Sequence, residues 1–303
     1  MSSAVEALPE ERLPVPPESA ASAVEPSTDD LPVTVIERRP SWRIVDLREL
    51  WRYHELLFFL TWRDVKVRYK QTVLGAAWAV LQPLATMIVF AMFLGRMAGA
   101  GASDIPYPLF VFAAMLPWTF FANAIGSAGN SVVGNQNLVT KVYFPRLIIP
   151  MSAVGAGLVD FAVAFVMLAG LMLYYGVLPG WQIVLAPLMV LLMTIAALGT
   201  GTLLSALTVA YRDVRYAVQF GVQLWMFATP CIYLNPETSI GPNGRLLLPL
   251  NPAYGLIDNF RRTVLGVPLD VYSLSVSAAV GVSLLLLGCL YFRRVERSFA
   301  DII

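Results

Sequence analysis

The chain has 303 residues, of which 57% are hydrophobic and only 14% are charged. A soluble globular protein carries about 25% charged residues, and the mean hydropathy here is +0.67. The composition therefore excludes an ordinary soluble domain and predicts an integral membrane protein. We expect the all-α class, because backbone polar groups need internal partners in lipid and no alternating barrel-strand pattern is present. The net charge of +1 carries no information, since the charges are segregated along the chain.

The first segment, residues 1–40, is rich in proline and acidic residues and holds little apolar surface. Such a segment cannot bury enough surface to offset the entropy of folding. We expect a disordered cytoplasmic tail over 1–40, followed by a membrane domain over 41–303.

An amphipathic helix is predicted next, over residues 46–60. Leu47, Leu50, Leu57 and Leu60 recur at helical spacing, and charged residues occupy other positions. This pattern is typical of a helix that lies on the inner membrane surface.

Six apolar stretches follow, each close to the roughly 20 residues that a helix needs to cross a bilayer. Ionisable residues mark the breaks between them, and Gly176, Pro179 and Gly180 separate the third stretch from the fourth. The expected spans are 74–95, 108–131, 148–175, 182–210, 216–234 and 271–292. Residues 246–257 are apolar but too short to cross and are interrupted by prolines. We expect them to form a re-entrant or interfacial outer segment, with an ordinary apolar outer loop as the alternative.

The orientation follows from the distribution of basic residues among the loops. Few lie on the predicted outer side: Arg96, Arg245, Arg261 and Arg262. Many more lie on the side of the two termini: Arg48, Arg52, Arg63, Lys66, Arg68, Lys70, Lys141, Arg146, Arg212, Arg215, Arg293, Arg294 and Arg297. Both termini are therefore predicted to be cytoplasmic.

Patterns for catalysis or metal binding are scarce. His54 is the only histidine, and Cys231 and Cys289 both lie in apolar runs. The sequence has no G-x-x-x-x-G-K-[ST] phosphate-binding loop, so we do not expect this chain to hydrolyse ATP. We therefore predict no catalytic residue and no metal ligand. Asp160 is the only acid well inside a predicted span, and it is either a transport residue or a helix-interface hydrogen-bond partner.

Aromatic residues are frequent in the predicted spans. Aromatic rings stack on the apolar faces of sugars, so a set of them inside a pore would guide a glycan. Core packing and lipid-facing belts are the alternative interpretation. The candidate channel residues are Trp118, Phe120, Phe121, Tyr174, Trp225, Phe227 and Tyr233.

The stretch from Leu60 reads LTWRDVKVRYKQTVLGAAWAVLQPL, with a basic lead-in followed by L-G-x-x-W and Q-P elements. Further motifs follow along the chain: Asn137-Leu138, Lys141 and Tyr143-Phe144-Pro145-Arg146; Tyr211-Arg212-Asp213-Val214; Asn251-Pro252 and Arg261; and Phe299 to Asp301. Together, and in this order, these motifs resemble the permease subunit of bacterial ABC exporters for polysaccharides. The resemblance covers about 46–303, and the first forty residues fall outside it.

This resemblance implies an exporter of lipopolysaccharide O-antigen, capsule or wall teichoic acid in the bacterial inner membrane. Two permeases would enclose a channel as a homodimer and bind two copies of a separate ABC nucleotide-binding subunit. ATP and magnesium would bind to that subunit, and this chain would hold no cofactor. No nucleic-acid partner is expected.

The resemblance also assigns roles to residues. The ATPase-coupling residues would be Asn137, Lys141, Tyr143, Phe144, Pro145, Arg146, Arg212 and Asp213. The inner gate would use Arg63, Lys66, Arg68, Tyr69 and Lys70, which meet either the substrate headgroup or anionic lipid. Arg261 and Arg262 would guide the departing headgroup or anchor a helix.

Two other functions fit parts of the pattern. A protein of the same fold could export drugs or small lipids. A membrane-embedded glycosyl- or acyltransferase would need an acid or histidine near the membrane surface, in a spacious outer loop. The predicted outer loops are short and contain no histidine.

Overall fold

The structure is a computed structural model that describes residues 47–70, 75, 77–94, 105–229, 244–296 and 299. All regular secondary structure in this part of the chain is helical. The described residues belong to one compact unit, Ser41–Ile303. The predicted tail over 1–40 and the predicted channel residue Tyr233 lie outside the described residues.

Long helices form the body of the molecule. They are α3 (Ala77–Leu94), α4 (Tyr107–Gly134), α6 (Ile148–Tyr175), α7 (Ala186–Ala210), α8 (Val214–Ala228) and α12 (Val271–Glu296). Shorter helices connect them: α1 (Leu47–Arg52), α2 (His54–Lys70), α5 (Gln136–Lys141), η2 (Trp181–Leu185), α10 (Gly244–Leu247), η3 (Leu248–Leu250) and α11 (Pro252–Leu265).

Four helical segments are long and apolar enough to cross a membrane: α4, α6, η2 continuing into α7, and α12. Their bounds agree closely with the second, third, fourth and sixth predicted spans. In α3 the apolar helical stretch is the shorter Val80–Phe93, and α8 has 15 residues. The first and fifth spans therefore stay predictions.

Local sequence signals explain where these helices begin and end. Gly176 ends α6 with φ 69°, and Gly266 ends α11 with φ 71°. Glycine adopts this left-handed conformation without the penalty that other residues incur. Asn251 begins α11, where its side chain accepts a hydrogen bond from the Ala253 amide at 3.1 Å.

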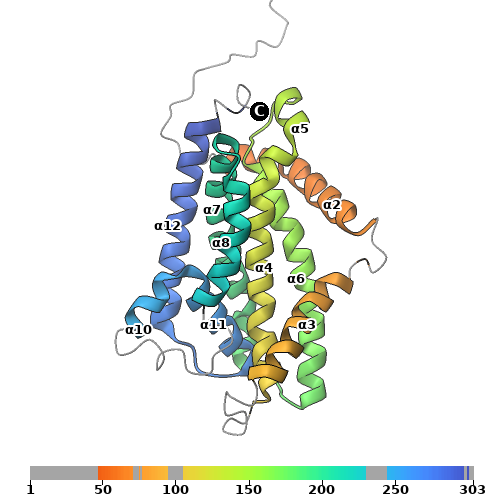
Figure 1. The fold of residues 1–303 in the computed structure, drawn as a ribbon, viewed down its shortest axis with the longest axis vertical. Helices are drawn as coiled ribbons and strands as arrows, with labels where there is room; N and C mark the ends of the chain where they lie inside the picture. Colours follow the sequence, from red (N-terminus) through yellow and green to blue (C-terminus); the bar gives the residue numbers. More distant parts are fainter. Residues whose placement is uncertain are drawn as a thin grey trace, which may run out of the picture. The chain divides into compact units, whose positions relative to one another are not determined.

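Helix α4 is the centre of the bundle (Figure 1). It contacts α3, α6, α7, α8 and α11, and it is the most buried of the four candidate spans. Edge-to-face rings link α4 to its neighbours: Phe120 packs on Phe161 of α6 with ring centroids 5.6 Å apart, and Phe161 packs on Phe260 of α11 at 5.7 Å. The core therefore joins spans that lie far apart in the sequence.

Small residues bring α7 and α12 into close contact. A Cβ atom added to Gly199 of α7 would collide with the α12 backbone at Leu285, and one added to Gly288 of α12 would meet the Gly199 carbonyl oxygen. Close backbone approach at small residues is a common way for helices to associate in membranes, where a hydrophobic driving force between helices is missing.

Two segments differ from their predicted form. The amphipathic segment is two helices, α1 and α2, and the second continues to Lys70 rather than ending at Leu60. The break lies at Tyr53, beside His54, whose ring Nδ1 is 2.8 Å from the Trp51 carbonyl oxygen. The predicted outer segment, residues 246–257, is helical over much of its length, and α11 is buried at every residue except Arg262. The alternative of an ordinary loop is therefore wrong, and the re-entrant or interfacial form stays a prediction.

Candidate functional site

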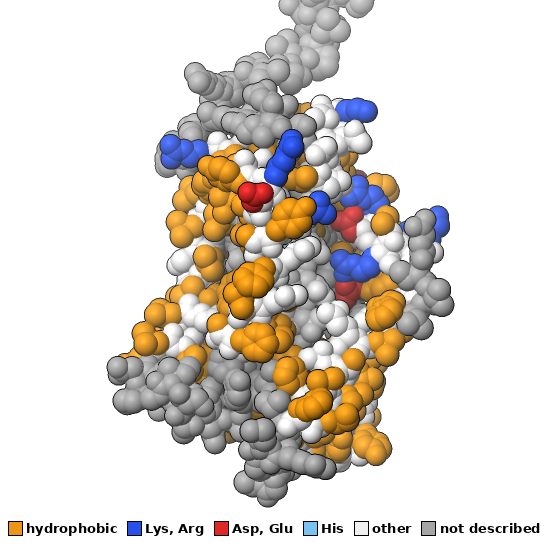
Figure 2. Space-filling model, in the orientation of Figure 1, with side chains coloured by type: hydrophobic (Ala, Val, Ile, Leu, Met, Phe, Trp, Pro, Cys, Tyr) orange, Lys and Arg blue, Asp and Glu red, His pale blue; other side chains and the backbone are white. Residues whose placement is uncertain are grey.

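A cavity of about 400 Å³ lies between α2, α3, α4 and α6. We call it the polar notch and define it by Arg68, Tyr69, Trp78, Gln82, Thr119, Phe120, Asn123, Ser127, Asp160 and Phe161. Figure 2 shows charged side chains gathered on the upper half of one face, with hydrophobic side chains covering much of the lower half. The polar notch combines charged and uncharged surface, since the Arg68–Asp160 pair faces amide, hydroxyl and aromatic groups.

The charged pair of the polar notch joins α2 to the middle of α6. Arg68 and Tyr69, at the end of α2, both donate hydrogen bonds to the Asp160 carboxylate. Burial raises the pKa of the Tyr69 phenol, and its hydrogen bond to Asp160 raises it further, so Tyr69 remains a protonated donor. Asp160 is thus a helix-interface partner in this structure, which is one of the two roles expected from sequence.

The other residues of the predicted inner gate lie along α2 and do not form one free cationic patch. Arg63 donates to Asp64 at 2.8 Å and to the Asn135 side chain, just before α5, also at 2.8 Å. Lys66 lies over the Trp62 ring at 5.4 Å, and Lys70 is exposed. Helix α2 is therefore tied to α6 at one end and to the α4–α5 junction near its middle.

The wall of the polar notch formed by α4 carries a polar stripe. Thr119, Asn123 and Ser127 repeat every four residues and therefore share one face of the helix. Sequence reasoning missed this stripe, although the spacing of polar residues within an apolar span would have revealed it.

The predicted ATPase-coupling residues divide into an exposed group and an internal group. Asn137, Lys141 and Tyr143 are exposed, as are Arg212 and Asp213 immediately before α8. Phe144, by contrast, is only 5% exposed and packs with the core near Ile148 and Phe292. We call the five exposed residues the end surface.

Arg146 is held within the chain. Its guanidinium donates to the Glu296 carbonyl oxygen and lies 5.9 Å from the Phe299 ring centroid. Pro145 beside it is half-buried. Arg146 therefore joins the 142–147 segment to the end of α12.

The predicted channel aromatics also occupy different environments. Trp118, Phe120 and Phe121 are at most 5% exposed, and the Trp225 indole donates to the Asn251 side chain at 2.8 Å. These four pack within the chain, and Phe120 also lines the polar notch. Tyr174 and Phe227 are exposed by 81% and 67%.

Phe227 belongs to an exposed stripe on α8 that sequence reasoning did not single out. Tyr216, Phe220 and Leu224 are also more than half exposed. Their spacing of four, four and three residues places all four side chains on one helix face.

The predicted outer arginines, expected either to guide the departing headgroup or to anchor a helix, form ion pairs within the chain. Asp258 pairs with both Arg261 and Arg262, and the Arg261 guanidinium carbon lies 4.0 Å from the centre of the Phe110 ring. Arg261 is only 6% exposed. Arg261 is therefore held between a carboxylate and an aromatic face within the fold.

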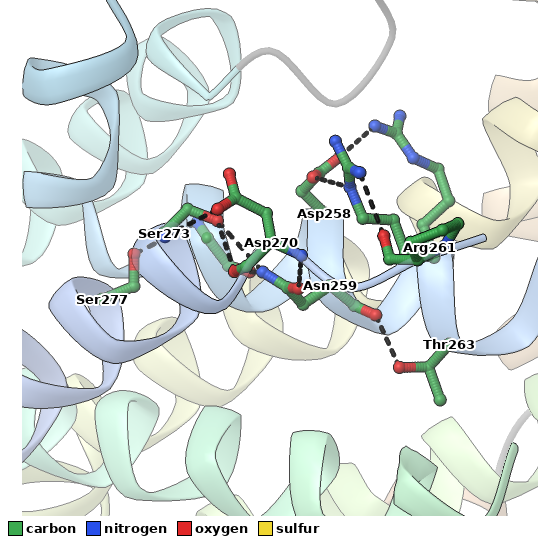
Figure 3. Close-up of polar contacts among 10 residues, drawn as sticks. Asp258, Asn259, Arg261, Thr263, Asp270, Ser273 and Ser277 are labelled. Carbon is green, nitrogen blue, oxygen red and sulfur yellow. Dashed lines mark hydrogen bonds and ion pairs between the residues drawn. The ribbon is translucent and has the colours of Figure 1, made fainter. Parts of the chain in front are cut away.

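A hydrogen-bond network surrounds this pair (Figure 3). The Asn259 side chain donates to Ser273 at 3.1 Å and accepts from the Asp270 amide at 2.9 Å. Ser277 of α12 donates to the Pro249 carbonyl oxygen at 2.8 Å. These contacts fasten α11 and η3 to the first turns of α12.

Comparison with known proteins places the chain in a family. Residues 55–265 match the family described as ABC-2 type transporter. The O-antigen export system permease protein RfbA of Myxococcus xanthus is 32% identical over 259 residues, which cover 84% of this chain and 98% of that protein. A Klebsiella pneumoniae protein of the same name is 26% identical over 82% of this chain and 95% of its own length. The polysialic acid transport protein KpsM of Escherichia coli is 26% identical over 76 residues, a quarter of this chain and 30% of KpsM. The helical fold, the four membrane-length helices and these matches agree: the chain belongs to the ABC-2 type transporter family.

Proposed function

We propose that this protein is the permease subunit of an ATP-driven exporter that moves lipid-linked polysaccharide across the bacterial inner membrane. The observation that carries the proposal is the match to an O-antigen export permease over 98% of that relative's length. Because the match spans nearly the whole relative, it includes the helices that line the polar notch as well as the end surface. The cargo class is that of O-antigen, capsule or teichoic acid.

The end surface is the proposed docking site for a separate nucleotide-binding subunit. Tyr143 is 89% exposed and Tyr211, beside Arg212, is 64% exposed. Exposed tyrosine and arginine side chains are the residue types that most often dominate interface energies. The partner would bind ATP and magnesium, and two copies would serve a permease dimer.

The α8 stripe supports the proposed homodimer and its channel. Tyr216, Phe220, Leu224 and Phe227 present an apolar and aromatic face that no other described element covers. In a dimer, this face would lie at or beside the passage between two protomers. Its rings would contact the apolar faces of sugars without holding the chain in one place.

Six spans and two cytoplasmic termini complete the proposed topology. The end surface, the start of α6 and the last turn of α12 lie at one end of the bundle, and α11 and the start of α12 lie at the other (Figure 1). Lys141, Arg212, Arg215, Arg293 and Arg294 all belong to the first end. This enrichment of basic residues supports a cytoplasmic assignment for that end.

Deletion of the gene and re-expression of the full chain test the proposal. We expect the deletion strain to lose a surface polysaccharide and to accumulate its lipid-linked form on the cytoplasmic side, and re-expression to reverse both effects. Unchanged surface polysaccharide together with impaired efflux of a small lipid or drug would assign the chain to the other exporter class.

A further inference from the structure

We propose that the polar notch is a saccharide-binding site, in which Gln82, Asn123 and Ser127 hydrogen-bond the hydroxyl groups of one sugar unit of the cargo. The inference rests on the proposed function, since it names where the permease holds the glycan. It differs from the predicted inner gate, which would use basic side chains to hold a phosphate.

The polar groups of the notch are available to a ligand. Within the described residues, the side chains of Gln82, Asn123 and Ser127 have no protein hydrogen-bond partner. Thr119, on the same face of α4, already donates to the Met115 carbonyl oxygen at 2.7 Å. Amide groups at membrane depth are costly when unpaired, and they commonly mark a substrate pathway or a water-filled cavity.

The chemistry of these free groups matches sugar hydroxyls. Each side-chain amide offers donors and an acceptor, and the serine hydroxyl offers both. A sugar hydroxyl also donates and accepts, so one sugar unit can satisfy all three side chains. The groups come from two helices, Gln82 from α3 and the other two from α4, and therefore approach a ligand from different directions.

The net charge of the notch favours a neutral ligand over a phosphate. Among the described residues that line the notch, Arg68 is the only cation, and the carboxylate of Asp160 already neutralises it. An anion would have to displace Asp160 and leave that carboxylate without its counter-charge. A neutral sugar leaves the Arg68–Asp160 pair intact.

The Trp78 ring and the volume of the notch also suit a sugar. Trp78 of α3 is 55% exposed and lies one helical turn before Gln82, so both side chains point to the same side of α3. An indole ring beside hydrogen-bonding groups suits a sugar, which has an apolar face and a polar rim. The volume of about 400 Å³ falls within the ~300–1,000 Å³ that small-molecule sites occupy.

The test measures binding to the full chain in lipid nanodiscs. The probe is an oligosaccharide prepared by hydrolysis from the polysaccharide that disappears from the surface of the deletion strain, freed of lipid and phosphate. Inorganic pyrophosphate is the second probe. We expect the oligosaccharide to bind and pyrophosphate neither to bind nor to compete.

Variants locate the binding. Gln82→Leu and Asn123→Leu should each weaken oligosaccharide binding about five- to tenfold, because each removes one or two hydrogen bonds. Ser127→Ala removes a single hydroxyl and serves as a further test if a leucine variant does not fold. Gln182→Leu, a matched change in η2 away from the notch, should leave the affinity unchanged.

The outcomes separate the two proposals. If the wild-type chain restores export but oligosaccharide fails to bind, or binds all variants equally, the saccharide site is wrong and the exporter function stands. Competition by pyrophosphate would also overturn it and assign the notch to a phosphate. If re-expression restores no surface polysaccharide, the proposed function fails and this inference fails with it.

Discussion

Arg68 at the end of α2 donates to the carboxylate of Asp160 in the middle of α6. A helix outside the four candidate spans thereby contacts the middle of one span and supplies a counter-charge to its acidic residue. The same helix contacts α6 twice more: a Cβ on Gly155 would lie 3.1 Å from the Thr61 hydroxyl, and Ser152 donates to Asp64 at 3.3 Å. The position of α2 is therefore set by a row of contacts along α6.

We predict that the Arg68–Asp160 pair couples energetically. Asp160→Asn and Arg68→Gln should each lower the melting temperature of the protein in nanodiscs. The double variant should lose less than the sum of the two, with a coupling of ~0.5–3 kcal/mol. Purely additive losses in this double-mutant cycle would show that the pair does not hold α2 on α6.

The ion-pair network of α11 should matter more for folding. Asp258→Asn leaves the buried Arg261 without its counter-charge, so we expect it to lose about 3–5 kcal/mol of stability. Arg262→Gln is the control, because it removes a side chain that is 33% exposed and leaves Asp258 paired with Arg261. Equal, small effects of both changes on thermal unfolding would contradict the burial of Arg261.

Close packing of α7 on α12 predicts opposite effects for two glycine substitutions. Gly288→Ala places a methyl group against the Gly199 carbonyl oxygen and the Thr202 hydroxyl, and should destabilise by about 1–3 kcal/mol. Gly170→Ala, on α6, meets nothing within 4 Å and should be neutral or stabilising by up to ~1 kcal/mol. If both variants unfold at the wild-type temperature, α7 and α12 do not approach as closely as described.

Substitutions of Tyr143 and Phe144, two neighbouring aromatic residues before α6, should affect subunit binding and protein stability separately. Tyr143→Ala should weaken binding of the nucleotide-binding subunit and leave thermal stability unchanged, because the Tyr143 side chain is 89% exposed. Phe144→Ala should instead lower stability by about 3–5 kcal/mol, since it leaves a cavity in the core. Affinity is measured by co-purification and stability by thermal unfolding, and a Tyr143→Ala protein that binds normally would remove this residue from the docking surface.

Helix bounds were predicted most accurately where the residues that start and end the helix are neighbours in the sequence. The bounds of α6 were predicted to the residue, because Arg146 precedes the apolar run and Gly176 can adopt the left-handed conformation that ends it. The length of α2 was underestimated for the opposite reason. Its last ten residues are held by Asp160 and Asn135, which lie far along the chain, so nothing local marks the segment as a helix.

Contacts between residues far apart in the sequence also limited the prediction of the candidate site. Burial of Arg261 depends on the Phe110 ring of α4, and no pattern near Arg261 predicts that contact. The candidate channel residues were chosen because they are aromatic. Whether an aromatic side chain faces the core or the surface depends instead on its position around the helix axis. Spacing distinguishes Phe220 and Phe227 on the exposed face of α8 from the packed Trp225.

The most direct test of the central claim uses the purified chain in nanodiscs together with the nucleotide-binding subunit of the same cell. ATP hydrolysis is measured with and without lipid-linked polysaccharide from the deletion strain. A polysaccharide exporter permease should form a stable complex with that subunit, and hydrolysis should change when the glycan lipid is added. Failure to form a complex with any nucleotide-binding subunit of that cell, or hydrolysis that is indifferent to the glycan lipid, would contradict the account.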